Sequence, residues 1–355
     1  MKIVAGLGSL ECFDAYAEAG ADEVFCGFAP FEWLEKYGVM APVNRREALL
    51  YPVQIASMTD MRLLARRCAQ TGIPASVAVN SVGYPPSLYP ALIRLLRALA
   101  DLGFERFILA EPALILRARE EKLHIQIHLS GEFGEYSRPA LRMLGGELIS
   151  RLIFHRKVTP EEMAACAREM PGREYEAFVL NERCIYTGAM CASLHADELP
   201  PLCRVPGKIA DVRETNKASF GGELPSKMEK IAEERKTKKT SFGGCLPSNA
   251  ERFAEDRERI RASLGGLLPS QVEKTTAERA PVCDEEALGA GGCGICALDV
   301  LERAGITHLK LVGRGNRPER MVRDIRALRK ALADRSKAKE TLFPDGCPGT
   351  CYYEP

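Results

Sequence analysis

The sequence predicts a (β/α)8 barrel of the TIM type, with a long insertion between its seventh and eighth strands. Two observations lead to this fold class. Eight short apolar runs alternate with segments of helical periodicity. Polar residues follow the apolar runs, at the strand ends where barrel enzymes place their chemistry. A doubly wound open sheet is the alternative, because it is built from the same strand–helix units.

The first half of the chain contains four strand–helix units. The expected strands are residues 2–6, 22–28, 73–81 and 106–110, and the expected helices are residues 9–19, 60–71, 86–102 and 112–121. Ser9 and Thr59 are the expected N-caps of the first two helices, because a side-chain hydroxyl can accept a free helix N–H. Residues 29–54 form a loop too long for a simple connection, and we expect it to border a site.

The second half contains the other four units. The expected strands are residues 123–130, 151–155, 173–181 and 307–313, and the expected helices are residues 136–144, 159–170, 296–304 and 317–333. Residues 123–130 alternate strictly, which places Ile127 and Leu129 on one face and His128 on the other. Thr159 and Pro160 are typical of an N-cap followed by the first residue of a helix.

The insertion contains an internal repeat. SFGGELPS, SFGGCLPS and SLGGLLPS begin at residues 219, 241 and 263, a period of 22 residues. The intervening helical segments carry too few apolar residues to bury a face, so we predict an exposed, mobile expansion. A basic arm for RNA is the alternative. The predicted organisation is residues 1–212 for the first seven units and a cysteine-rich loop, 213–282 for the repeats, 283–335 for a cysteine-bearing helix, strand eight and the closing helix, and 336–355 for a tail.

Composition narrows the class of protein. The chain has 355 residues, 46% hydrophobic and 27% charged, with a formal net charge of +1. This is globular composition, and it gives no overall attraction to nucleic acid or membrane. The first residues do not read as a signal peptide, and no apolar run approaches the roughly 18 residues of a membrane span. We therefore expect a cytoplasmic protein without a membrane partner.

The cysteines indicate metal or redox chemistry. There are 13 of them in a chain without a recognisable export signal, and disulfides are rare in a reducing cytosol. We expect four to be buried core residues, namely Cys12, Cys26, Cys68 and Cys166. Seven of the others gather in three segments. Cys184, Cys191 and Cys203 follow strand seven, Cys293 and Cys296 precede strand eight, and Cys347 and Cys351 lie in the tail.

Thiolates collected from a strand end, a loop and the start of a helix suit an iron–sulfur cluster, with zinc as the alternative. The tail pair could add a ligand, hold a second metal or form a reactive pair. An exposed, frayed end is the alternative for the tail.

The segments around these cysteines resemble the collagenase-like peptidase family U32. The resemblance covers the predicted barrel but not the repeats or the tail. It rests on these matching positions: Glu176, Phe178, Val179, Cys184, Gly188, Cys191, Cys203, Arg204, Gly305, Lys310, Gly313 and Arg314, together with GADEVFCG at 20–27 and HLS at 128–130.

The family includes iron–sulfur proteins that hydroxylate RNA or quinone precursors without oxygen. The resemblance therefore implies that Cys184, Cys191, Cys203 and Cys296 hold a 4Fe–4S cluster, with Cys293, Cys347 and Cys351 in reserve. It implies modification of RNA or of a small aromatic substrate. The alternatives are a collagenase-like protease and a non-catalytic partner subunit stabilised by a cluster or zinc.

Five further residues are candidates for catalysis or substrate binding. His128, at the end of strand five, could act as an acid or base. Glu176 is a buried carboxylate that needs a partner, for which Lys310 is suitable. Arg156 and Arg314 at strand ends suit an anionic substrate. His124 and His128 would lie about 13 Å apart along a strand, too far to share one zinc ion.

Overall fold

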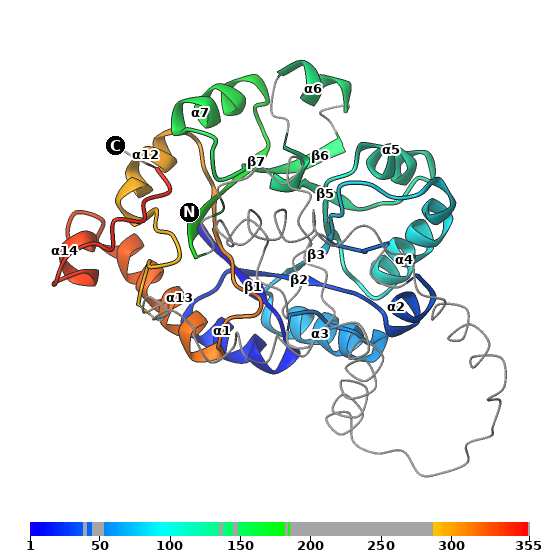
Figure 1. Ribbon diagram of the computed structural model, residues 1–355, viewed down its shortest axis with the longest axis horizontal. Coiled ribbons are helices and arrows are strands. Elements are labelled where there is room, and N and C mark those ends of the chain that lie inside the picture. Colours follow the sequence, from blue (N-terminus) through cyan, green and yellow to red (C-terminus); the bar gives the residue numbers. More distant parts are fainter. Residues whose placement is uncertain are drawn as a thin grey trace, which may run out of the picture. The chain divides into compact units, whose positions relative to one another are not determined.

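The computed structural model describes residues 1–37, 41–44, 53–134, 138–144, 148–181, 184 and 287–353. Eight strands, all parallel to their neighbours, close into a barrel in chain order, and β8 pairs with β1 (Figure 1). The predicted (β/α)8 barrel is confirmed. The alternative of an open sheet is wrong, because Val4 of β1 pairs with Lys310 of β8 and closes the ring.

All eight predicted strands are present, most of them within a few residues of their expected bounds. They are β1 (Lys2–Leu7), β2 (Glu23–Gly27), β3 (Ala75–Val79), β4 (Arg106–Leu109), β5 (Gln126–Leu129), β6 (Ile149–Ile153), β7 (Glu174–Leu180) and β8 (His308–Leu311). Residues 182–183, 185–286 and the two last residues lie outside the described part of the chain, so the predicted repeats at 213–282 and the proposed division of the chain stay predictions.

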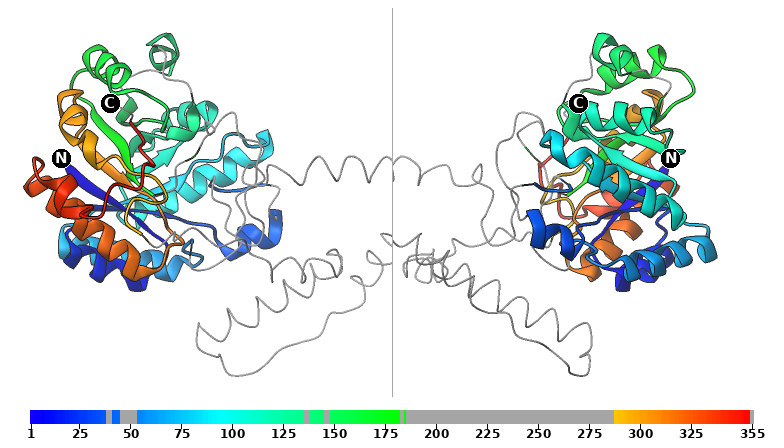
Figure 2. Two further views of the ribbon diagram at one scale, coloured as in Figure 1. Left: turned by 60° about the vertical axis from the view of Figure 1, so that its left-hand side comes forward. Right: turned by 90° about the vertical axis from the view of Figure 1, so that its right-hand side faces the viewer.

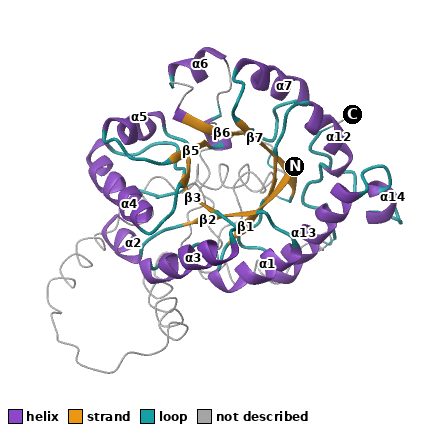
Figure 3. Ribbon diagram, turned by 180° about the vertical axis from the view of Figure 1, so that it is seen from behind, coloured by secondary structure: helices purple, strands orange, loops and turns teal. Residues whose placement is uncertain are grey.

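The helices follow the strands and form the outer layer (Figures 2 and 3). They are α1 (Phe13–Ala19), α2 (Phe31–Tyr37), α3 (Met58–Thr71), α4 (Tyr89–Asp101), α5 (Pro112–Glu120), α6 (Arg138–Met143), α7 (Pro160–Glu169), α12 (Leu298–Arg303), α13 (Pro318–Ala333) and α14 (Ala338–Leu342). Short 3-10 turns precede or follow them: η1 (Leu10–Cys12), η3 (Pro86–Leu88), η4 (Gly131–Phe133) and η8 (Ile295–Ala297).

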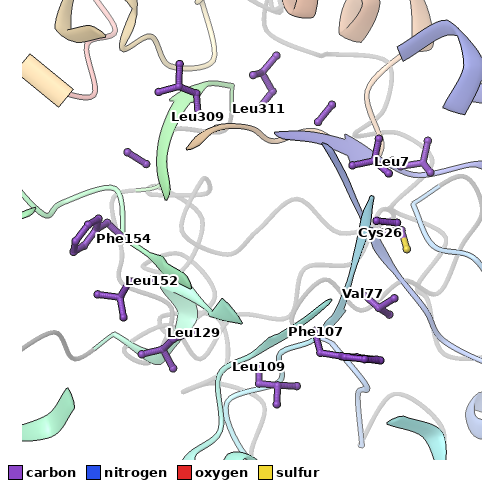
Figure 4. Packing of buried hydrophobic residues seen from close by; sticks show 14 of the residues in the cluster. Leu7, Cys26, Val77, Phe107, Leu109, Leu129, Leu152, Phe154, Leu309 and Leu311 are labelled. Carbon is purple, nitrogen blue, oxygen red and sulfur yellow. The ribbon is translucent and has the colours of Figure 1, made fainter. Parts of the chain in front are cut away.

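The main apolar core lies between the barrel and the helices. Alternate strand residues such as Leu7, Val77 and Leu309 are completely buried and belong to this core, and they point outward from the ring of strands (Figure 4). Because side chains alternate along a strand, the residues between them face the interior of the barrel. The predicted faces of strand five are confirmed, since Ile127 and Leu129 join the outer core and His128 does not.

Several local predictions need correction. Helix α3 begins two residues earlier than expected, and its N-cap is Ser57, not Thr59, because the Ser57 hydroxyl accepts the Asp60 N–H at 3.0 Å. Thr159 does cap α7, in a complete capping box with Glu162. Of the four cysteines expected in the core, Cys26 and Cys166 are buried, but Cys12 and Cys68 are only half-buried.

The structure also contains two helices that the sequence did not predict. Helix α2 lies inside the segment read as a loop, and α14 lies inside the tail. Both are short, at seven and five residues, so their periodicity is too brief to recognise. Among the described residues, no helix is both long and apolar enough to cross a membrane.

Candidate functional site: the barrel interior, its rim and the thiol-bearing wall

A buried ion network fills the amino-terminal part of the barrel interior. At its centre lies Arg151 of β6, whose side chain is fully buried. Its guanidinium donates to Glu23 of β2 at 2.8 and 3.0 Å, to Glu174 of β7 at 2.7 and 2.9 Å, and to Glu176 of β7 at 2.9 Å. Lys310 of β8 donates to the other Glu176 oxygen at 2.5 Å. The expected pair of Glu176 and Lys310 is therefore present.

The charges in this network are mutually stabilised. Burial alone would raise the pKa of Glu176, but Lys310 and Arg151 outweigh it and lower the pKa to about 2. The pKa of the Glu23 carboxyl is likewise lowered against the effect of burial, through His308 and Arg151. His128 behaves differently, since burial, reinforced by Arg151, holds its pKa well below its ordinary value. His128 is therefore a neutral imidazole at physiological pH.

This network predicts a specific acid sensitivity. The folded-state pKa of Glu176 lies below its value in an unfolded chain, roughly 4.3. Its contribution to stability is therefore complete above about pH 5 and is lost as the pH falls toward 2. In Glu176→Gln we expect a shallower decline of the free energy of unfolding over this range, measured by urea unfolding at each pH. The control is Glu120→Gln, which removes an exposed pair with Arg117. The prediction would be contradicted if the free energy of unfolding declined with falling pH as shallowly in this control as in Glu176→Gln.

An apolar layer separates this network from the carboxyl-terminal end of the barrel. In six strands, an inward-facing polar residue is followed two positions later by an apolar residue. Because side chains alternate along a strand, this apolar residue also faces inward and lies nearer the carboxyl end of the strand. The pairs are Glu23 and Phe25, Ser76 and Ala78, Arg106 and Ile108, Arg151 and Ile153, Glu176 and Phe178, and Lys310 and Val312. The second residues of these pairs form, with Val4, an apolar cluster of their own inside the barrel.

Beyond this layer, polar side chains form what we call the rim: Asn44, Gln54, Asn80, Ser130, Arg156 and Arg314. The Arg314 guanidinium donates to Asn44 Oδ1 at 3.2 Å and to Gln54 Oε1 at 3.5 Å. The amides of Asn44 and Gln54 also bond to each other, at 2.8 and 3.0 Å. Both belong to the segment that was expected to border a site, and here they hold an arginine that follows β8.

Close packing at the end of β2 makes this arrangement possible. A Cβ atom on Gly27 would lie 1.9 Å from both Arg314 Nη1 and Gln54 Oε1. Only glycine leaves room for these groups at that position. On the opposite side of the rim, the Arg156 guanidinium lies 3.9 Å from the centre of the Phe178 ring, and Asn80 donates to Ser130 Oγ at 3.1 Å. The rim thus places two guanidinium groups over an apolar, aromatic layer.

The structure divides the five predicted catalytic residues into two groups. Arg156 and Arg314 lie at the rim, as expected. His128 and Lys310 were expected at strand ends, and Glu176 was expected as a buried carboxylate beside Lys310. All three side chains are buried inside the barrel, where Glu176 and Lys310 pair in the ion network. His128 Nδ1 is 3.4 Å from Ser76 Oγ, and its Nε2 has no hydrogen-bond partner among the described residues. Whether any of the five takes part in catalysis stays a prediction.

One wall of the barrel end carries Cys184, Cys293 and Cys296, and we call it the thiol-bearing wall. Asn181 follows β7 in the left-handed conformation, with φ of 67°, and redirects the chain toward Cys184. Its N–H donates to Gly292 O at 3.0 Å, and Gly294 N–H donates to Val179 O at 2.7 Å. Leu180 and Cys293 face each other in an antiparallel bridge. The end of β7 and the segment 292–294, which leads to Cys296, are thus fastened together by their backbones.

Asn181 joins this wall to its surroundings. Its side-chain amide donates to Asp324 Oδ2 at 2.8 Å, and its Oδ1 accepts from Arg320 at 3.1 Å. The pair Asn181–Asp324 is buried, so α13 holds the turn that leads to Cys184. The left-handed conformation costs free energy in most residues but is tolerated by asparagine. We infer that the fold maintains this turn because it directs the chain that follows β7.

Two of the four expected cluster ligands, Cys184 and Cys296, lie in the described part of the chain. Cys184 is half-buried and Cys296 is exposed, and neither is in a disulfide, so both thiols are chemically suitable donors for iron. The backbone bonds of Asn181 and Gly294 bring their two segments together. Cys191 and Cys203 lie outside the described residues, within which no three Cys, His, Asp or Glu side chains are grouped as metal ligands. The residues in view fit a thiolate-bound group, and the complete ligand set stays a prediction.

Sequence reasoning missed three important residues. Arg151 was read only as the first residue of a strand, although it centres the ion network. Asn44 and Gln54 were read as loop residues. In each case the function of the residue depends on partners that are far away in sequence, such as Glu23 for Arg151 and Arg314 for Asn44. The one available signal was the unusual length of the segment 29–54.

The fold and the site define a (β/α)8 barrel with an arginine-bearing rim and a thiol-bearing wall beside β7. The model of peptidase family U32 matches residues 8–198, and the chain belongs to this family. The resemblance seen in the sequence is thereby confirmed.

Curated relatives are similar over part of the chain. The tRNA hydroxylation proteins P of Escherichia coli K12 and Haemophilus influenzae are each 26% identical over 126 residues, which is 35% of this chain. The match spans 28% and 27% of their respective lengths. Among solved structures, a U32 peptidase is 15% identical with a TM-score of 0.37, covering 50% of this chain and 68% of that one.

Proposed function

We propose that this protein is an iron–sulfur enzyme that modifies RNA, with tRNA as the substrate class and hydroxylation as the reaction. The observation that carries the proposal is the thiol-bearing wall. The backbones that lead to Cys184 and to Cys296 are hydrogen-bonded to each other at the barrel end where this fold places its chemistry. The names of the curated relatives support tRNA as the substrate and hydroxylation as the reaction.

Cys184, Cys191, Cys203 and Cys296 would hold the cluster, which supplies one-electron redox chemistry when bound. Of the two thiols in the CGIC segment, Cys296 is exposed in the turn η8 before α12, whereas Cys293 is buried. Burial raises the pKa of Cys293 to about 12, and ligation requires the thiolate. The exposure of Cys296 and the burial of Cys293 favour Cys296 as the fourth ligand.

The rim would bind the substrate. Arg314, held by two amides, and Arg156, stacked on Phe178, present planar cations to which phosphate oxygens can bind. The aromatic layer beneath them suits a flat base, because bases extruded from RNA are commonly stacked on aromatic side chains. The chain has a net charge of only +1, so recognition would depend on these local arginines rather than on the overall field.

The test is a nucleoside analysis of tRNA from cells that lack this protein. Supplying the wild-type chain under anaerobic growth is expected to restore one hydroxylated nucleoside, detected by mass spectrometry. Cys184→Ser and Cys296→Ser are expected to fail. The matched control is Cys68→Ser, a half-buried thiol on α3 outside the wall. Unchanged nucleosides, together with cleavage of gelatin or peptides that survives Cys184→Ser, would instead establish the alternative of a peptidase.

A further inference from the structure

The C-terminal tail is packed against the thiol-bearing wall. After α14, the side chains of Phe343 and Tyr353 are buried. Tyr353 donates through its hydroxyl to Phe178 O of β7 at 2.8 Å, and Tyr352 hydrogen-bonds to Asn181 O. In Figure 1 the red tail returns to the side of the barrel where α12 lies. The alternative of a frayed end is therefore wrong for the described residues up to 353.

The register of the tail places two cysteines directly opposite each other. Cys293 N–H donates to Thr350 O at 2.9 Å, and Tyr352 N–H donates to Cys293 O at 2.7 Å. These two bonds make Cys293 and Cys351 partners in a parallel bridge. Paired residues on neighbouring strands lie about 4.8 Å apart, with their side chains on the same face. That spacing is within the range of roughly 4.4–6.8 Å between the Cα atoms of a disulfide.

We propose that Cys293 and Cys351 are a redox pair that forms a reversible disulfide. Neither cysteine is part of a disulfide in this structure. Cys351 is half-buried and Cys293 is buried, so a small oxidant such as hydrogen peroxide reaches Cys351 first. The Cys351 thiolate displaces hydroxide from the peroxide and becomes a sulfenic acid. The Cys293 sulfur then attacks this sulfur, the S–O bond breaks, and water leaves with the Cys293 proton. In total, two thiols and one peroxide give one disulfide and two waters.

Cys347 is the competing partner, because its charge raises the pKa of the Cys293 thiol more strongly than the charge of Cys351 does. It sits on a turn in which Gly346 and Gly349 have φ of 107° and 71°. No backbone bond of the kind that aligns Cys351 is present between Cys347 and Cys293 in the described residues. The bridge therefore selects Cys351, and Cys347→Ser is the matched control variant.

The disulfide would have two consequences for the wall. It would close residues 293–351 into a covalent loop that contains α12, β8 and α13, and would thereby fix the tail against β7. It would also commit Cys293 to the tail and leave Cys296, three residues on, as the thiol of this segment that can bind metal. The second consequence rests on the proposed function, whereas the disulfide itself does not.

The test uses the full chain, oxidised with hydrogen peroxide and compared with the reduced protein. Peptide mapping without reductant is expected to show one cross-link between the segments of Cys293 and Cys351. It should persist in Cys347→Ser and Cys296→Ser and vanish in Cys293→Ser and Cys351→Ser. The oxidised wild type is expected to melt about 5 °C or more above the reduced protein, because the cross-link restricts the unfolded chain.

A cross-link between Cys347 and Cys351, or full alkylation of Cys293 and Cys351 after oxidation, would overturn the proposal. The readout is separate from RNA modification. If the cross-link forms but no nucleoside changes, the redox pair stands and the proposed function fails. If the nucleoside changes but no cross-link forms, the proposed function stands and the redox pair fails.

Discussion

Replacing Arg151 with methionine is expected to lower the free energy of unfolding by about 3–5 kcal/mol, the largest effect on stability that we predict. The fully buried guanidinium has three carboxylate partners, Glu23, Glu174 and Glu176. Methionine fills much of the same volume but deprives the buried Glu23 of this cation and leaves Glu176 with Lys310 alone. Leaving a buried charge unpaired costs far more than the net value of the ion pair itself.

The matched control is Arg142→Met. Arg142 of α6 pairs with Glu169 at 3.2 Å, but its side chain is 75% exposed, and exposed pairs contribute about 0–1 kcal/mol. Urea unfolding followed by circular dichroism measures both variants. Equal free energies of unfolding for Arg151→Met and Arg142→Met would show that the ion network does not stabilise the fold.

The second large effect concerns the rim. In Gly27→Ala, the new Cβ would lie 1.9 Å from Arg314 Nη1 and Gln54 Oε1. Both atoms are at the ends of flexible side chains, so the fold can accommodate the methyl group while the guanidinium is displaced. A hydrogen bond to a charged group contributes about 1.5–3 kcal/mol. We therefore expect roughly 10- to 100-fold weaker binding of tRNA, with stability little changed.

Filter binding at fixed salt concentration measures this affinity, since contacts with phosphate depend strongly on salt. Gly83→Ala is the control, because no atom lies within 4 Å of the position where its Cβ would be. Arg314→Met should reproduce the loss seen in Gly27→Ala. Equal affinity of Gly27→Ala and Gly83→Ala for tRNA would show that the rim does not take part in substrate recognition.

The fold could be predicted because its signals are local. Each strand is a short apolar run, and most of the helices have a period or a cap that the sequence displays, as Thr159 and Pro160 do for α7. The interior of the barrel could not be predicted in the same way. Arg151 lies 128 residues from Glu23 and 157 from His308. Nothing in the neighbourhood of any one of them reveals that closure of the barrel brings them together.

The candidate site was predictable where it depends on residue type and strand position. Arg156 and Arg314 follow strands, and the thiols of Cys184 and Cys296 were recognisable by their chemistry. The complete burial of His128 was not predictable, because it depends on side chains that other strands bring to the barrel interior. The docking of the tail was hidden for a similar reason. The register of the tail depends on its backbone hydrogen bonds to Cys293. The residues next to the tail cysteines include glycine and proline, which are typical of an exposed turn.

The central claim is that thiols beside β7 bind an iron–sulfur cluster, and the iron and acid-labile sulfide content of protein purified without oxygen tests it most directly. We predict about four iron and four sulfide per chain, lost in Cys184→Ser and Cys296→Ser and retained in Cys68→Ser. Colourless protein that holds zinc and takes up no iron after anaerobic reconstitution would contradict the account.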